Sequence, residues 1–210
     1  MFSQEDLKER WRDLCIAYTN DVVLIDKRWE SIKDAYTAKK RHYHNLDHLN
    51  NMFREFDTCF HLLDEFKAFQ IAIFYHDIIY NVKRKDNEAK SAALAVEQLK
   101  EMSFPAGLID KTNQMILATK DHELHKEQSV NLFVDVDMAI VGYDWEIYDE
   151  YAKNVRKEYS IYPDILYKKG RREVLKHFLA MESIFKTELF QNKYEARARE
   201  NIQRELQSLT

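Results

Sequence analysis

The chain has 210 residues, of which 45% are hydrophobic and 32% charged, and its formal net charge is −4. This length suits one domain with a substantial core, and the acidic balance provides no general basic field for an extended nucleic acid. The sequence contains only three Gly and two Pro. Folds rich in β-strands need more turn residues than that, so we expect an all-α protein.

Several absences in the sequence indicate a soluble protein of the cytoplasm. No stretch approaches the roughly 18 apolar residues that a membrane span requires, and the first residues do not resemble a signal peptide. The two cysteines, Cys15 and Cys59, lie on apolar stripes without a CxxC spacing. We therefore predict two buried free thiols in a reducing compartment.

The first third of the chain predicts three amphipathic helices. Ser3 and Asp6 form the pattern of a capping box before the first helix, and Asn45 is the predicted N-cap of the third. Apolar residues recur at helical spacing in all three. They are Leu7, Trp11, Leu14 and Tyr18; then Trp29, Ile32 and Tyr36; then Leu46, Leu49, Phe53, Phe56 and Phe60.

A fourth helix is predicted at about residues 64–81, and it is apolar nearly all round, so it should run through the core. It includes the adjacent pair His76 and Asp77. An ionised carboxylate among so much hydrocarbon would cost several kcal/mol or more unless a cation compensates it. Burial on every side would let both side chains reach one ion, although they differ by about 100° around a helix.

The rest of the chain predicts further helices. Asp86 or Asn87 should cap a fifth, residues 103–105 should break the chain, and a sixth should end near residues 121–122. Residues 133–137 alternate like a short strand, but the run that ends at Gly142 favours a buried helix. Three helices should follow, at 145–160, 164–187 and 188–208. We predict a single domain over 1–210, with its core at about 40–145 and helices 146–210 packed on it.

Histidine and carboxylate residues that could share a metal ion occur in three predicted helices. His48 lies in the first turn of the third helix, His76 and Asp77 in the fourth, and Asp135 and Asp137 in the later apolar run. Imidazole and carboxylate are usual ligands of zinc, manganese and iron, and a hydrolytic site keeps one position open for water. The pattern predicts a metal site.

These residues resemble the HD-domain metal-dependent phosphohydrolase superfamily, an all-helical fold named for its His-Asp doublet, and more closely a bacterial subgroup of predicted HD phosphohydrolases. The motifs are residues 41–48 (RHYHNLDH), 74–80 (FYHDIIY), 87–92 (NEAKSA), 118–122 (ATKDH), 135–142 (DVDMAIVG), 155–159 (VRKEY), 170–172 (GRR) and 195–201 (EARAREN). The resemblance spans almost the whole chain and implies a metal-dependent phosphohydrolase.

The resemblance implies that His48, His76, Asp77 and Asp137 hold a divalent metal ion, which could be Zn, Mn, Fe, Ni or Mg. Two assignments have alternatives. His44 could be the ligand, with Arg41 on phosphate, but His48 is preferred because its 28-residue separation from His76 is close to that of short HD hydrolases. Asp137 is preferred to Asp135 because the family's last ligand precedes an apolar helical run.

The implied reaction is hydrolysis of a small phosphate ester such as a nucleotide. Asp77 and His44 would be the catalytic residues, with His44 donating a proton to the departing oxygen. Neither a membrane nor an extended nucleic acid is expected as a partner, whereas a homodimer is compatible with the sequence. The candidates for substrate binding are Arg41, Glu88, Lys120, His122, Arg156 and Arg171.

Two other functions fit the same ligand pattern. Some HD proteins are di-iron oxygenases, in which His122 would be an added ligand and Asp77 a bridge between metals. The other alternative is a non-catalytic helical binding protein that is stabilised by its metal.

Overall fold

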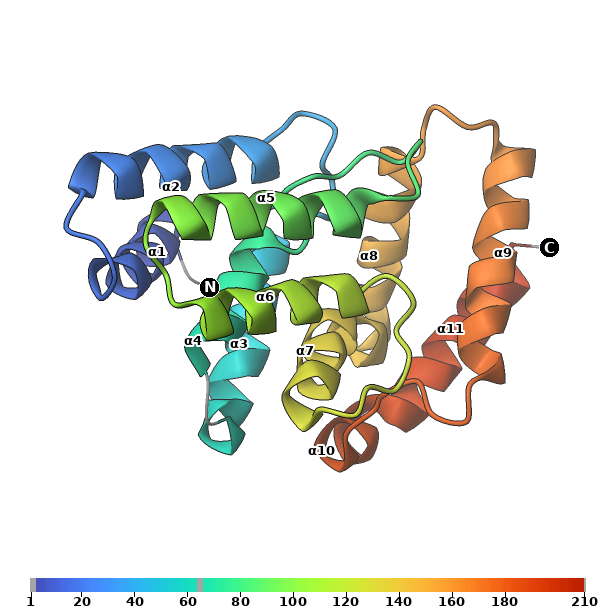
Figure 1. The fold of residues 1–210 in the computed structure, drawn as a ribbon. Coiled ribbons are helices and arrows are strands. Elements are labelled where there is room, and N and C mark those ends of the chain that lie inside the picture. The colour runs from blue at the N-terminus through green and yellow to red at the C-terminus, as the bar shows by residue number, and fades with distance from the viewer. Residues whose placement is uncertain (1–2, 64–65, 210) are drawn as a thin grey trace. The chain divides into compact units, whose positions relative to one another are not determined.

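The computed structural model describes residues 3–63 and 66–209. These residues form helices and turns without a β-strand, and ten of the helices have ten residues or more (Figure 1). The all-α class and the expected number of helices are therefore confirmed. The chain divides into two compact units, residues 1–125 (unit 1) and 126–210 (unit 2). The boundary lies within the segment predicted as the core, and the single domain stays a prediction.

Unit 1 is built around a helix in which seven of the ten residues are buried. This helix, α4, packs against α6, which in turn lies beside α5 (Figure 1). Trp11 and Trp29 contact the ring of Phe74 on α4, so the first two helices also pack on it. The helices of unit 1 are α1 (Gln4–Ile16), α2 (Val22–Tyr36), α3 (Leu46–Cys59), the 3₁₀ turn η1 (Phe60–Leu62), α4 (Phe66–Tyr75), α5 (Asn87–Glu101) and α6 (Ala106–Ala118).

Two predicted helix starts are confirmed by their hydrogen bonds. At the start of α1, the Ser3 hydroxyl accepts from the Asp6 N–H and the Asp6 carboxylate accepts from the Ser3 N–H, which is a complete capping box. At the start of α3, the Asn45 side chain accepts from the N–H groups of Asp47 and His48. The second cap fixes the backbone that carries His48.

The predicted helix at 64–81 is too long, because α4 ends at Tyr75. A helical Asp77 N–H would donate to the Ile73 carbonyl, but that carbonyl accepts from His76 Nδ1 at 2.9 Å. The Asp77 N–H donates to the Tyr36 hydroxyl at 3.2 Å instead. Tertiary partners thus replace the helical ladder, and the His76-Asp77 doublet lies in the turn after α4. Residues 64 and 65 of the prediction lie outside the described residues.

α5 begins where predicted, with Asp86 at its N-cap position, whereas the end of α6 differs from prediction. The Asp86 side chain makes no capping hydrogen bond but binds Arg84, and Asn87 Oδ1 accepts from the Asn81 N–H. Both side chains therefore organise the preceding loop. α6 ends at Ala118, and His122 has a positive φ of 52°, which a continuing helix does not allow.

Unit 2 begins with α7 (Gln128–Met138) and the 3₁₀ segment η2 (Ala139–Gly142), so the predicted helix, not a strand, is confirmed there. Gly142 is required by packing, because a Cβ at this position would lie 2.5 Å from Cβ of Tyr194. The remaining elements are α8 (Trp145–Glu158), α9 (Asp164–Ala180), α10 (Glu188–Phe190), the π-helical segment η3 (Gln191–Glu195) and α11 (Ala196–Ser208).

The predicted helix at 164–187 is too long, whereas the helix at 188–208 is confirmed, because α10, η3 and α11 follow one another without a break. α9 stops at Ala180, because charged side chains bind the backbone of the segment that follows. Glu195 accepts from the N–H groups of Ile184 and Phe185, and Arg199 donates to the carbonyls of Met181 and Glu182. These distant partners hold residues 181–187 in a non-helical path that periodicity could not reveal.

Candidate metal centre

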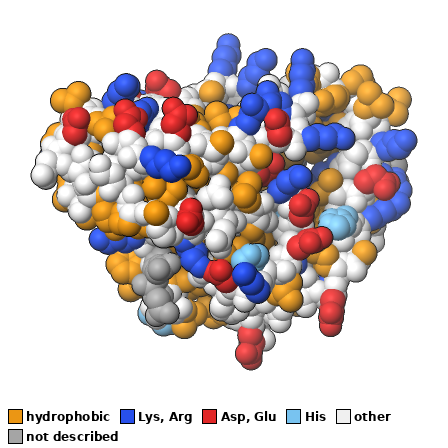
Figure 2. Space-filling model, viewed as in Figure 1, with side chains coloured by type: hydrophobic (Ala, Val, Ile, Leu, Met, Phe, Trp, Pro, Cys, Tyr) orange, Lys and Arg blue, Asp and Glu red, His pale blue; other side chains and the backbone are white. Residues whose placement is uncertain are grey.

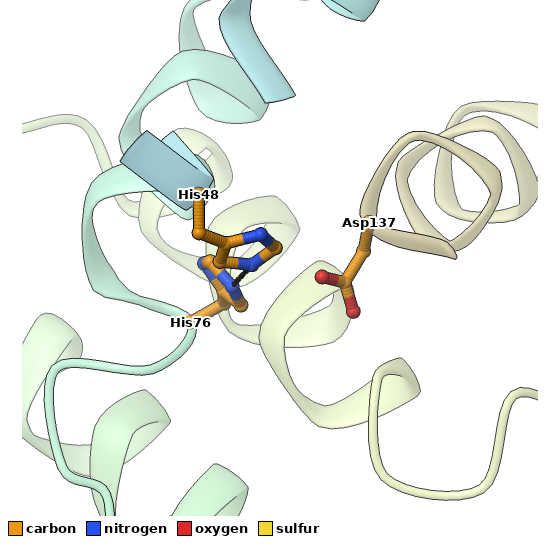
Figure 3. Close-up of side chains that lie close together, drawn as sticks. All are labelled: His48, His76 and Asp137. Atoms are coloured by element: carbon orange, nitrogen blue, oxygen red, sulfur yellow. Dashed lines mark hydrogen bonds between the residues drawn. The ribbon is translucent and has the colours of Figure 1, made fainter. Parts of the chain in front are cut away.

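Two buried histidines of unit 1 face each other. His48 comes from the first turn of α3, where Asn45 caps the helix, and His76 directly follows α4. Their Nε2 atoms lie 3.0 Å apart, and the side chains are only 3% and 1% exposed (Figure 3). At this separation, either one Nε2 donates a hydrogen to the other or both lone pairs face one cation.

The hydrogen bond of the other ring nitrogen orients His76. Its Nδ1 lies 2.9 Å from the Ile73 carbonyl oxygen. Because a carbonyl can only accept, Nδ1 carries the hydrogen, and Nε2 of the neutral ring has a lone pair that faces His48. Metal-binding histidines have this arrangement, in which a backbone carbonyl fixes the tautomer and leaves the second nitrogen for the ion.

The distances between the donor atoms fit a shared metal ion. Two nitrogens held about 2.0–2.1 Å from one ion are about 2.9 Å apart at a right angle and about 3.3 Å apart at the tetrahedral angle. The separation of 3.0 Å between His48 and His76 lies in this range. Asp77 adds a carboxylate oxygen, Oδ2, at 3.3 Å from His76 Nε2. The chemistry and the spacing of the two imidazole nitrogens therefore suit a divalent metal.

His44 lies at the exposed side of this group. Its Nε2 is 3.8 Å from Asp77 Oδ2, and its ring stacks on Tyr80 at 4.1 Å between centroids. The side chain is 19% exposed, in contrast to the buried His48 and His76. Within unit 1, His76 thus lies beside both His48 and Asp77, and Asp77 lies near His44, the other predicted catalytic residue.

The fourth predicted ligand belongs to unit 2. Asp137 is the penultimate residue of α7 and is partly exposed.

The alternative ligand, Asp135, is occupied inside unit 2. Its Oδ1 accepts from the Lys186 N–H at 2.7 Å, and its Oδ2 accepts from the N–H and the hydroxyl of Thr187 at 2.7 and 2.6 Å. Burial raises the pKa of Asp135 to about 6, although these hydrogen bonds oppose the rise. Both oxygens are used in holding residues 186 and 187, so the structure favours Asp137 over Asp135 as a ligand.

The predicted phosphate contact Arg41 is bound to the backbone around the doublet. Its Nη1 donates to the carbonyls of His44 and Asp77 at 3.1 and 2.7 Å, and its Nη2 donates to the Ile78 carbonyl at 2.9 Å. The guanidinium lies over the rings of Tyr36 and Tyr80, at 4.9 and 5.5 Å from their centroids. In this structure Arg41 joins the segment of His44 to that of Asp77.

Two other predicted substrate contacts are engaged within unit 2. Arg156 binds Asp164 and the carbonyls of Tyr159 and Tyr162, between α8 and α9. Arg171 makes a two-pronged ion pair with Glu205 at 2.7 and 2.8 Å, and both side chains are less than a tenth exposed.

The other predicted substrate residues lie in unit 1. Lys120 is exposed, His122 is half-buried in the turn after α6, and Glu88 is half-buried in the first turn of α5. Charges of both signs are interspersed over the molecular face drawn in Figure 2.

The sequence did not identify Tyr36 and Tyr80 as residues of this region. Tyr36 belongs to the apolar stripe of α2, yet its hydroxyl accepts from the Asp77 N–H. Tyr80 follows the doublet and stacks on His44. A tyrosine at a helix end has no distinguishing local pattern, so only the tertiary structure could assign these contacts.

Comparison of the chain with models of protein families, with curated proteins and with solved structures gives no match. The likeness to HD phosphohydrolases therefore rests on the sequence motifs alone. Among the described residues, no helix has both the length and the apolar character needed to cross a membrane.

Proposed function

We propose that this chain is a metal-dependent phosphohydrolase that cleaves a small phosphate ester, such as a nucleotide. The observation that carries the proposal is the buried pair of His48 and His76, with Nε2 atoms 3.0 Å apart and the His76 tautomer set by Ile73. Asp77 places a carboxylate beside this pair. The order of these residues along the chain resembles the HD pattern, and hydrolysis of a phosphate ester is what that resemblance implies.

The residues that would hold the metal are His48, His76, Asp77 and Asp137. A divalent ion bound there would supply hydroxide at neutral pH, because such ions lower the pKa of a water from about 15.7 toward about 7, and it would polarise the phosphoryl oxygen. His48 and His76 contribute neutral donors, and the two carboxylates balance the charge of the ion.

His44 would act on the leaving group. An imidazole with an ordinary pKa near 6.5 can hold a proton at neutral pH and release it to a departing oxygen. The ring is held by its stacking on Tyr80 and lies 3.8 Å from Asp77, yet it remains partly exposed. This position suits a group that touches substrate better than one that is enclosed in a metal shell.

The predicted substrate-binding residues differ in whether their side chains are already used in ion pairs. The guanidinium groups of Arg156 and Arg171 are used in ion pairs of unit 2. Lys120 is exposed, so we propose it as a contact to phosphate oxygens, with His122 and Glu88 as further contacts to the substrate. The predicted homodimer and the cytoplasmic location stay predictions.

The decisive experiment measures metal content and phosphate release together. The purified protein is loaded separately with Zn, Mn, Fe, Ni and Mg and assayed on a panel of nucleotides and sugar phosphates. We expect stoichiometric metal and turnover of at least one ester, both lost in Asp77→Ala. The control variant Asp86→Ala removes an exposed carboxylate that pairs with Arg84 and should behave as wild type.

Other outcomes would contradict the proposal. If the folded protein cannot be loaded with a stoichiometric amount of any of these metals, the assignment of the metal site is wrong. A second iron with oxygen-dependent turnover, detected by iron spectroscopy after anaerobic preparation, would indicate a di-iron oxygenase. Stoichiometric metal without hydrolysis of any ester would indicate a binding protein that is stabilised by its metal.

A further inference from the structure

Arg41 connects the two segments that carry the candidate site in unit 1. One segment holds His44 and His48, and the other holds His76 and Asp77. The Arg41 guanidinium reaches across them, with donors on the carbonyls of His44, Asp77 and Ile78. Its shortest hydrogen bond, 2.7 Å, is to the carbonyl of Asp77 itself.

The backbone of Asp77 needs such a partner because α4 has already ended. Carbonyls at the C-terminal end of a helix lack partners within the helix, and a cation near that end is favoured by the helix dipole. Arg41 provides both the donors and the charge. Tyr36 completes the support from the other side, since its hydroxyl accepts from the Asp77 N–H at 3.2 Å. Both backbone polar groups of Asp77 are therefore held by side chains from distant positions.

We propose that Arg41 is a positioning residue that holds the Asp77 carboxylate in place for the metal, with Tyr36 as its partner, and that it is not a substrate contact. This inference rests on the proposed metal site. Two guanidinium nitrogens are committed to three carbonyls, and the rings of Tyr36 and Tyr80 lie against the group. Aromatic rings beside a guanidinium stabilise it in one orientation.

Lysine should not replace arginine in this role. A guanidinium offers a rigid fork of donors, and here the fork spans carbonyls of neighbouring residues, whereas an ammonium is a single point of charge on a flexible stem. Arg41→Lys therefore keeps the charge but loses the geometry. If Arg41 acted only through its charge, the lysine variant would behave as wild type.

The test measures cobalt affinity and the visible spectrum of the cobalt-loaded protein. We expect Arg41→Lys to weaken Co²⁺ binding by about 10- to 100-fold, the usual effect of losing a residue that orients a ligand, and to alter the d–d bands. Tyr36→Phe removes a single acceptor and should give a smaller loss in the same direction. Arg84→Lys, an exposed arginine paired with Asp86, is the matched control and should leave affinity and spectrum unchanged.

Three results would overturn the inference. Wild-type cobalt affinity and spectrum in both Arg41→Lys and Tyr36→Phe would exclude a positioning role. Lower unfolding stability of metal-free Arg41→Lys with unchanged cobalt affinity would show a purely structural role. Weaker binding of inorganic phosphate to the cobalt-loaded Arg41→Lys, again with unchanged cobalt affinity, would show a substrate contact. His76→Ala separates the hypotheses: if it keeps wild-type cobalt affinity, the proposed metal site itself is wrong.

Discussion

His76 donates its Nδ1–H to the carbonyl of Ile73, three residues earlier, at 2.9 Å. This bond takes the carbonyl that a continuing helix would use for Asp77, and it also leaves the His76 Nε2 lone pair directed at His48. This one local hydrogen bond therefore both ends the regular hydrogen bonding of the helix and fixes the tautomer in which His76 Nε2 can bind a metal ion.

Metal binding should stabilise the protein through His76. Saturation to about 1,000 times the dissociation constant adds about 4 kcal/mol to the free energy of unfolding, because only the folded chain presents the site. Thermal unfolding with Zn²⁺ and with a chelator measures this difference. We expect it to vanish in His76→Ala and to persist in His61→Ala, which removes an exposed histidine. An equal zinc effect in both variants would contradict the assignment of the ligand.

His44→Ala should slow hydrolysis according to the leaving group. An alkyl phosphate needs a proton on its departing oxygen, so turnover should fall by about 10²- to 10⁴-fold. A nitrophenyl phosphate leaves as a stable anion and should be affected much less, while metal content stays at the wild-type level. The measurement compares kcat for the two esters. A uniform loss for both esters, or loss of metal, would argue against a proton donor.

Asp135→Asn and Asp137→Asn should have opposite effects on stability and metal binding. The amide in Asp135→Asn cannot accept all the hydrogen bonds from Lys186 and Thr187, so buried donors lose partners and unfolding should become easier by about 2–4 kcal/mol. Urea denaturation of the metal-free protein measures this cost. Asp137→Asn should change that stability by less than about 1 kcal/mol but weaken metal binding. If Asp135→Asn instead weakens metal binding and Asp137→Asn lowers the stability of the metal-free protein, Asp135 is the ligand.

Gly142→Ala should destabilise unit 2. The new Cβ would meet Cβ of Tyr194 at 2.5 Å, so the backbone must shift at a cost of about 1–3 kcal/mol. Gly170→Ala is the matched control, because it lies within α9 with nothing within 4 Å and should gain up to about 1 kcal/mol from helix propensity. Chemical denaturation of the two variants gives the comparison. Equal effects would show that Tyr194 does not require a glycine.

Arg171→Met should lower stability, because it leaves the buried Glu205 carboxylate without its cationic partner, although the Tyr148 hydroxyl still donates to it. Breaking such a pair costs about 3–5 kcal/mol, whereas replacing both partners by apolar residues costs less. The double variant Arg171→Met/Glu205→Leu should therefore recover part of the loss in urea denaturation. A stable single variant with weaker substrate binding would instead support the role in substrate binding predicted from the sequence.

Local sequence patterns were sufficient for much of the fold. Low Gly and Pro content predicted an all-α chain, and the capping box of Ser3 and the cap by Asn45 placed two helix starts correctly. These features depend on residues within one helical turn, so they can be recognised without tertiary contacts. The patterns failed at the end of α4 and at the end of α9, where side chains bind backbone groups that a regular helix would use.

The sequence by itself determined the helical class, the caps that carry His48, and the residue types from which a metal site could be built. Only the tertiary structure brought His48 and His76 into contact, engaged Asp135 with Thr187, and bound Arg41 to the backbone of Asp77. The physical reason is that helix periodicity reports which face of a segment is buried. It does not report which distant donor or acceptor satisfies the polar groups at the segment's ends, and the candidate site is built from those groups.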